Sequence, residues 1–167
     1  GFHLVNTFLL LGALIGQLYF AENKKYSLVP RNKNETYIWA LSIILFIFVG
    51  ATGAIAALGN TLFPETSLVA GILKDFSSSS HILIRLRVLH PLFALALFGL
   101  IQYLMYGKNQ IYFRWTSHIS WVGVIFGAIN WMLLAPKWGA LLHLFLADAL
   151  WCLFCYTIVF RYFEGTD

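Results

Sequence analysis

The sequence predicts an all-α, polytopic membrane protein: a four-helix transmembrane bundle with one extra transmembrane helix. Of its 167 residues, 60% are hydrophobic and only 11% are charged, and the mean hydropathy is +0.76. A soluble domain of this length cannot bury so much apolar surface. The apolar residues also gather in five stretches of about 20 residues, the length that a helix needs to cross the hydrocarbon core of a bilayer.

These stretches give the expected elements in order. We expect helices over residues 2–20, 37–58, 83–106, 115–134 and 139–160. A polar, basic loop separates the first two, and a long loop that contains four consecutive serines separates the second from the third. Gly12 and Gly16 in the first helix, and Gly123 and Gly127 in the fourth, have the spacing that lets helix backbones approach each other closely.

The distribution of basic residues predicts the orientation. The loops and tail at one end carry seven of the 11 Lys and Arg residues, and the opposite end carries four. Because cytoplasmic loops of membrane proteins are enriched in Lys and Arg, we expect the loop 22–36 to be cytoplasmic and Gly1 to lie outside. The expected location is the cell inner (plasma) membrane, crossed several times.

The first helix stands apart from the other four. His3-Leu4 begins it and His143-Leu144 lies near the start of the last helix, so the two helices resemble each other at their outer ends. This short repeat suggests an internal duplication. We therefore expect residues 1–21 to be the last helix of an earlier four-helix half, 22–36 to be a cytoplasmic loop, and 37–167 to be a complete four-helix bundle. The sequence begins without Met or a basic leader, so we expect it to be part of a longer chain.

Two histidines are the strongest candidates for function. His90 and His143 lie in different predicted spans, at a similar depth toward the outer face. An intramembrane imidazole is costly unless it has a partner. A heme iron with two open axial positions binds two neutral imidazoles, so the pair predicts a bis-histidine heme site toward the extracytoplasmic side and a bound heme b.

Two arginines lie nearer to the outer surface than His90. Arg87 precedes it by three residues and shares its helix face, and Arg85 lies further out. Guanidinium groups pair strongly with carboxylates, so both are candidate ligands of the heme propionates. They could equally mark the end of the helix at the lipid headgroups.

Four segments give the sequence a resemblance to a known family. These are ATGAIAALGNTLFP (51–64), RLRVLHP (85–91), GAINWMLLAP (127–136) and LHLFLADALW (142–151). In this order and spacing they resemble the heme A synthases, membrane oxidoreductases of cytochrome oxidase biogenesis. The resemblance implies two four-helix halves, with heme b between His90 and His143 in the C-terminal half.

The resemblance also implies a reaction and partners. The reaction would oxidise the C8 methyl of heme O, the substrate, to the formyl group of heme A. His3 would be a ligand of the substrate heme, although its partner histidine and the catalytic glutamate of the family are absent from this sequence, so the chain alone should be inactive. The implied partners are heme O, membrane lipid, and heme O synthase or cytochrome oxidase assembly factors. A homo-oligomer is left open, and no nucleic acid is expected.

Two other classes of protein remain as alternatives. A non-catalytic membrane b-type cytochrome would pass electrons, but it usually has a histidine pair in each leaflet, and the inner leaflet here offers only His118. A transporter could use the histidines as proton relays, but it should contain more intramembrane acids than Asp148.

Overall fold

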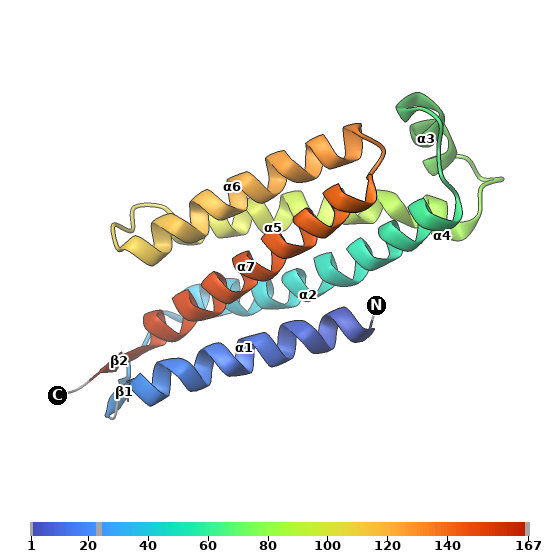
Figure 1. Ribbon diagram of the computed structural model, residues 1–167. Helices are drawn as coiled ribbons and strands as arrows, with labels where there is room; N and C mark the ends of the chain where they lie inside the picture. Colours follow the sequence, from blue (N-terminus) through green and yellow to red (C-terminus); the bar gives the residue numbers. More distant parts are fainter. Residues whose placement is uncertain (1, 23–24, 166–167) are drawn as a thin grey trace.

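The computed structural model describes residues 2–22 and 25–165 and contains five long helices (Figure 1). They are α1 (Phe2–Glu22), α2 (Lys33–Leu62), α5 (Leu89–Met105), α6 (Ile111–Met132) and α7 (Lys137–Tyr162). Two short helices, α3 (Leu68–Asp75) and α4 (Ile82–Arg85), lie between α2 and α5, and the 3₁₀ turn η1 (Leu86–Val88) joins α4 to α5. The strands β1 (Tyr26–Leu28) and β2 (Phe163–Gly165) form one short antiparallel pair.

The predicted fold class is confirmed. Four described helical segments have the length and apolar composition to cross a membrane: His3–Glu22, Lys33–Leu62, Ile82–Met105 and Lys137–Tyr162. Helix α6 corresponds to the remaining predicted span, residues 115–134. It has 22 residues, about 33 Å at 1.5 Å per residue, but Arg114, His118 and Asn130 lower its mean hydropathy, and it is not among these four segments.

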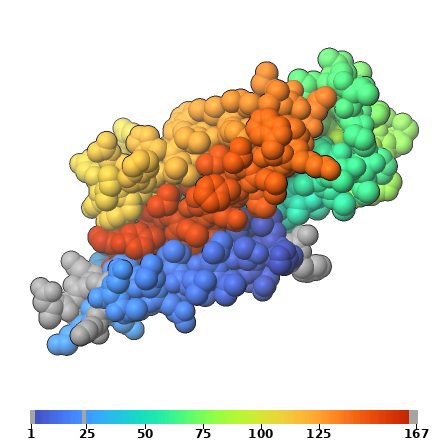
Figure 2. Space-filling view, viewed as in Figure 1, coloured from blue at the N-terminus to red at the C-terminus, as the bar shows by residue number. Residues whose placement is uncertain are grey.

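Helices α2, α5, α6 and α7 form a four-helix bundle (Figure 1). Neighbours around the bundle are α2 with α5, α5 with α6, and α6 with α7, so that α5 and α7 lie diagonally opposite each other. Helix α1 packs outside the bundle against α7 and α2, and Figure 2 shows it lying along α7 for much of its length. Residues 25–32 and the end of α7 meet at one end of the molecule, where β1 pairs with β2.

The third predicted helix is interrupted near its start. Pro91 lacks the N–H that would bond to the carbonyl of Arg87, and the chain forms the 3₁₀ turn η1 just before it. This turn divides the predicted helix 83–106 into α4 and α5. The fourth helix ends two residues before its predicted end: Leu134 and Ala135 adopt positive φ angles of 60° and 53°, and Pro136 disfavours a helical residue before it.

The buried core occupies only the half of the bundle nearest to the β1–β2 pair. Its members are Phe8, Trp39, Phe46, Leu97, Ile101, Leu104, Met105, Phe113, Trp151 and Phe154. In the other half, each long helix of the bundle has a described stretch without a single fully buried residue. These stretches are 53–58 in α2, 89–96 in α5, 121–132 in α6 and 140–150 in α7. The fully buried core side chains therefore gather toward one end of the bundle, and the side chains around His90 and His143 are only partly buried.

Candidate functional site

His90 and His143 meet in the half of the bundle that lies away from the buried core. His90 belongs to the first turn of α5 and His143 to the second turn of α7, and their ring centroids lie 6.1 Å apart with an interplanar angle of 84°. Because α5 and α7 lie diagonally across the bundle, the two imidazoles point toward each other through its interior. Both side chains are half-buried. The sequence-based expectation that these two residues face each other holds in the structure.

Each imidazole rests against a glycine of a neighbouring helix. A Cβ atom placed on Gly53 of α2 would lie 3.0 Å from Cε1 of His90, and one on Gly127 of α6 would lie 2.8 Å from Cε1 of His143. Real Cβ atoms are rarely this close to another atom, so a larger residue at either position would push the ring away. The two helices that separate α5 from α7 thus provide the space that the rings occupy.

The two rings differ in their polar contacts. Nδ1 of His90 lies 3.2 Å from the carbonyl oxygen of Val49. A carbonyl can only accept, so Nδ1 carries the proton and Nε2 keeps its lone pair. Nδ1 of His143 is buried and, among the described residues, has no hydrogen-bond partner.

The spacing of the rings fits a metal held between them. Imidazole nitrogens bind metals at about 2 Å and lie roughly 1 Å from the ring centre, so two axial imidazoles on one iron have ring centres about 6 Å apart. The observed 6.1 Å agrees with this value. The free lone pair of His90 and the unpartnered nitrogen of His143 also suit a ligand with a central metal. No group of three or more His, Cys, Asp or Glu side chains suited to a metal ion occurs within residues 2–22 and 25–165.

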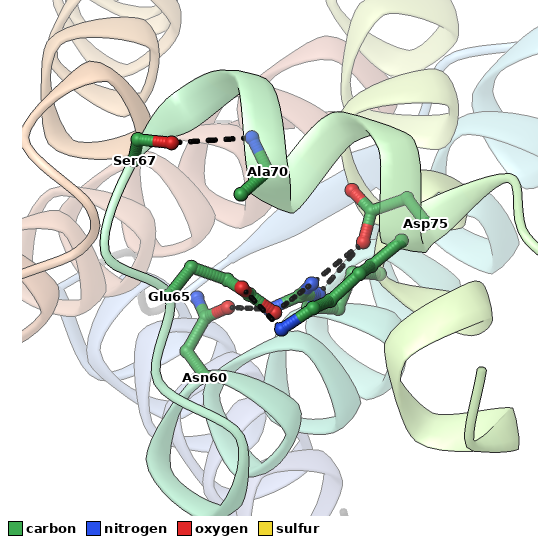
Figure 3. Close-up of polar contacts among 7 residues, drawn as sticks. Asn60, Glu65, Ser67, Ala70 and Asp75 are labelled. Atoms are coloured by element: carbon green, nitrogen blue, oxygen red, sulfur yellow. Dashed lines mark hydrogen bonds and ion pairs between the residues drawn. The ribbon is translucent and has the colours of Figure 1, made fainter.

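Arg87 has protein partners in place of the predicted propionates. It is buried, with a relative exposure of 8%, and its Nε and Nη2 lie 2.9 and 2.8 Å from the same carboxylate oxygen of Asp75. Its Nη1 donates to Asn60 at 2.9 Å, and Glu65 lies 3.7 Å from Nη2. Figure 3 shows Asn60, Glu65 and Asp75 converging on this cluster, which fastens the α3 segment to the end of the bundle.

The other predicted ligands lie apart from the histidine pair. Arg85, two residues from Arg87, is exposed. His3 is exposed at the start of α1, where its carbonyl accepts a hydrogen bond from Thr7. His81 caps α4 through its Nδ1, and His118 lies near the carbonyl of Arg114 on the outer face of α6. The structure therefore brings together His90 and His143 among the predicted site residues, and it adds Val49, Gly53 and Gly127 to them.

Comparison with known proteins finds two curated relatives of this chain. Two proteins named protoheme IX farnesyltransferase, from two strains of Thermus thermophilus, are each 31% identical to it over 162 residues. The match covers 92% of this chain but 27% of each relative, so the chain spans about a quarter of the length of the curated relatives it matches. No family model matches the sequence, and no solved structure matches it either.

These relatives contradict the interpretation as part of a heme A synthase. Their name denotes transfer of a farnesyl group to protoheme IX, whereas a heme A synthase oxidises a methyl group of heme O. The predicted oxidoreductase activity and the oxidation of heme O are corrected with it, and the alternative of an electron-passing cytochrome gains no support either. The role of His3 as a heme ligand stays a prediction. The residues that carried the resemblance are small residues, prolines and histidines inside helices. Such residues determine helix packing and ligand contact, and they do not specify a reaction.

Proposed function

We propose that this chain is a heme-holding membrane unit in which His90 and His143 are the axial ligands of a protoheme-type heme. The whole protein would then act on protoheme IX, as the name of the relatives states for them. The chain itself would bind and orient the heme within the membrane, on the extracytoplasmic side. The heme would supply an iron with two axial positions for the histidines.

One observation carries this proposal: two imidazoles face each other across the bundle with ring centres 6.1 Å apart. Intramembrane histidines can also form interhelical hydrogen bonds, but neither of these two is hydrogen-bonded to the other, and Nδ1 of His143 is buried without a described partner. A buried imidazole nitrogen that lacks a partner costs free energy unless a ligand occupies it. The likeness to proteins that act on protoheme agrees with a heme in this position.

The test is spectroscopic and uses the purified chain in detergent. We expect the chain to take up hemin and to give the spectrum of a six-coordinate, low-spin b-type heme on reduction. Replacement of either ligand, in His90→Ala or His143→Ala, should lose heme or shift it to a high-spin spectrum, because one axial bond is missing. His118→Ala is the matched control, since that histidine is exposed on the outer face of α6.

A wild-type spectrum that persists in both His90→Ala and His143→Ala would contradict the assignment. So would equal loss of heme in the His118→Ala control, because heme would then be binding without regard to the site. Farnesyl transfer to protoheme is a separate question for the full-length protein. There the same two substitutions should raise the KM for protoheme if the chain presents the heme to the transfer reaction.

A further inference from the structure

The two proposed ligands are held in place by different means. His90 is fixed by a hydrogen bond, since its Nδ1–H donates to the carbonyl of Val49 at 3.2 Å. Hydrogen bonds of this kind set the tautomer and the orientation of a metal-binding histidine and raise its basicity. Their loss typically lowers metal affinity about 10- to 100-fold. His90 therefore has the features of a permanent ligand.

Among the described residues, His143 is held by packing alone. Neither of its ring nitrogens has a described hydrogen-bond partner, so whichever nitrogen binds the iron, no hydrogen bond at the other one sets the tautomer of the ring. Its ring lies against Gly127 on one side and is stacked on Phe126 at a centroid distance of 6.5 Å and an angle of 19°. Van der Waals contacts restrict a ring less strongly than a hydrogen bond with a defined direction.

We propose that the ligands are unequal: His90 anchors the heme iron, and His143 is an exchangeable ligand whose position can be taken by a small neutral iron ligand. This proposal rests on the heme-binding function proposed above. In the exchange, the bond between iron and the nitrogen of His143 breaks and a bond between iron and the incoming ligand forms, with no change in the oxidation state of the iron. The released imidazole stays neutral in its place beside Gly127.

The first test compares the two ligand variants in the hemin-loaded chain. We expect His90→Ala to lower heme affinity at least about tenfold more than His143→Ala does, because only His90 has an acceptor behind it. His143→Ala should keep a five-coordinate, high-spin heme that binds carbon monoxide when reduced. Free imidazole should return its ferric form to the low-spin spectrum.

The second test leaves both ligands intact and changes the glycines beneath them. In Gly127→Ala the new methyl group displaces His143, so we expect a rise in the high-spin fraction and faster binding of carbon monoxide, with heme retained. Gly123→Ala is the matched control on the same helix, one turn earlier, because nothing lies within 4 Å of a Cβ there.

The corresponding change beneath the anchor is Gly53→Ala. Its methyl group displaces His90 and should instead lower heme affinity. Gly99→Ala is the control for this change, since a Cβ at Gly99 also has no atom within 4 Å.

The outcomes separate this inference from the heme assignment itself. If wild-type chain binds no low-spin heme through these histidines, the proposed function fails. If it does bind heme but the two histidine variants lose equal affinity, or Gly127→Ala has the same spectrum as Gly123→Ala, the ligands are equivalent and only this inference is overturned. Far-UV circular dichroism identifies a histidine variant that has unfolded. In that case the comparisons of Gly127→Ala with Gly123→Ala and of Gly53→Ala with Gly99→Ala test whether the two ligands are unequal.

Discussion

Arg85 and Arg87 are two positions apart in the sequence but differ in burial and in ion pairing. Arg87 is buried between the carboxylates of Asp75 and Glu65, whereas Arg85 is exposed. The guanidinium of Arg87 neutralises acids that are themselves mostly shielded from water, since the Glu65 side chain is only 6% exposed and that of Asp75 only 15%. A buried acid left without its cation is strongly unfavourable.

This contrast gives a prediction for stability. Arg87→Met should lower the free energy of unfolding by about 3 kcal/mol, because it leaves the shielded carboxylate of Asp75 without a cation, although Glu65 keeps its ion pair with Lys74. Arg85→Met removes the same charge at an exposed position and should change stability by less than about 0.5 kcal/mol. Thermal unfolding of both variants in the same detergent measures the difference. Equal effects would mean that the Arg87 cluster does not hold the α3 segment in place.

At the residue scale, the sequence predicted the histidine pair but not the partners of the arginines. Imidazoles inside apolar stretches are conspicuous because lipid offers them no partner. Glu65 and Asp75 lie in the predicted loop between the second and third helices, and their spacing in the sequence does not indicate where they fold. The sequence therefore did not indicate that Arg87 would pair with carboxylates of the chain itself.

At the scale of elements, helix α1 is attached to the bundle through a small aromatic cluster. The ring of Phe8 is stacked on Trp151 of α7 at a centroid distance of 5.4 Å and meets Phe46 of α2 edge-on at 5.6 Å. The indole N–H of Trp151 donates to the carbonyl of Phe8 at 2.6 Å. A Cβ on Gly50 would lie 2.7 Å from Cε2 of Phe8, so α1 and α2 approach closely at this glycine.

We expect Gly50→Val to weaken this attachment. The added side chain must displace the Phe8 ring from a close-packed site, which typically costs about 1–3 kcal/mol. Gly16→Val is the control, because it makes the same chemical change in a membrane helix where nothing lies within 4 Å of a Cβ. Thermal melting in detergent should show a lower Tm for Gly50→Val than for Gly16→Val. Indistinguishable melting temperatures would contradict the role given to the aromatic cluster.

The five long helices were predictable because apolar stretches of the right length have few other interpretations. Their boundaries were less so: α2 extends four residues beyond the predicted range at each end, to Lys33 and Leu62. Pro91 could have indicated the 3₁₀ turn before α5, since its missing N–H is evident from the sequence. Helix α3 was missed, because its eight residues are too few for a span and they lie inside a polar loop. The spacing of Gly123 and Gly127 predicted a close approach of helix backbones. Gly127 does have a close neighbour, but this neighbour is the imidazole of His143 and not a helix backbone.

At the scale of the whole molecule, burial divides the bundle into two parts. The fully buried aromatic and aliphatic core lies in one half, and the side chains around His90 and His143 are only partly buried. This division could not be predicted from the sequence, because burial depends on which side chains face inward. The reaction could not be predicted either. A reaction depends on the groups of the active site, and the residues that carried the family resemblance determine helix packing instead.

The orientation of the bundle follows from the charges at its two ends and is open to a direct test. At one end Arg161 pairs with Glu35 at 2.7 Å and its carbonyl accepts two hydrogen bonds from Arg31, which ties the basic loop to the end of α7. The α3 segment lies at the other end of α2 (Figure 1). Because Lys and Arg are enriched in cytoplasmic loops, we expect the end with Arg161 to face the cytoplasm and the α3 segment to lie outside.

Cysteine labelling in intact cells distinguishes the two orientations. With Cys152 and Cys155 replaced by Ala, a membrane-impermeant maleimide should label Ser78→Cys, whose site is exposed beyond α3. It should label Asn109→Cys, exposed between α5 and α6, only after the cells are made permeable. The reverse pattern would place the histidine pair in the cytoplasmic half of the membrane, so that heme would enter and leave the site from the cytoplasm. Labelling of both sites in intact cells would mean that the chain inserts in both orientations, as a modest excess of seven basic residues over four allows.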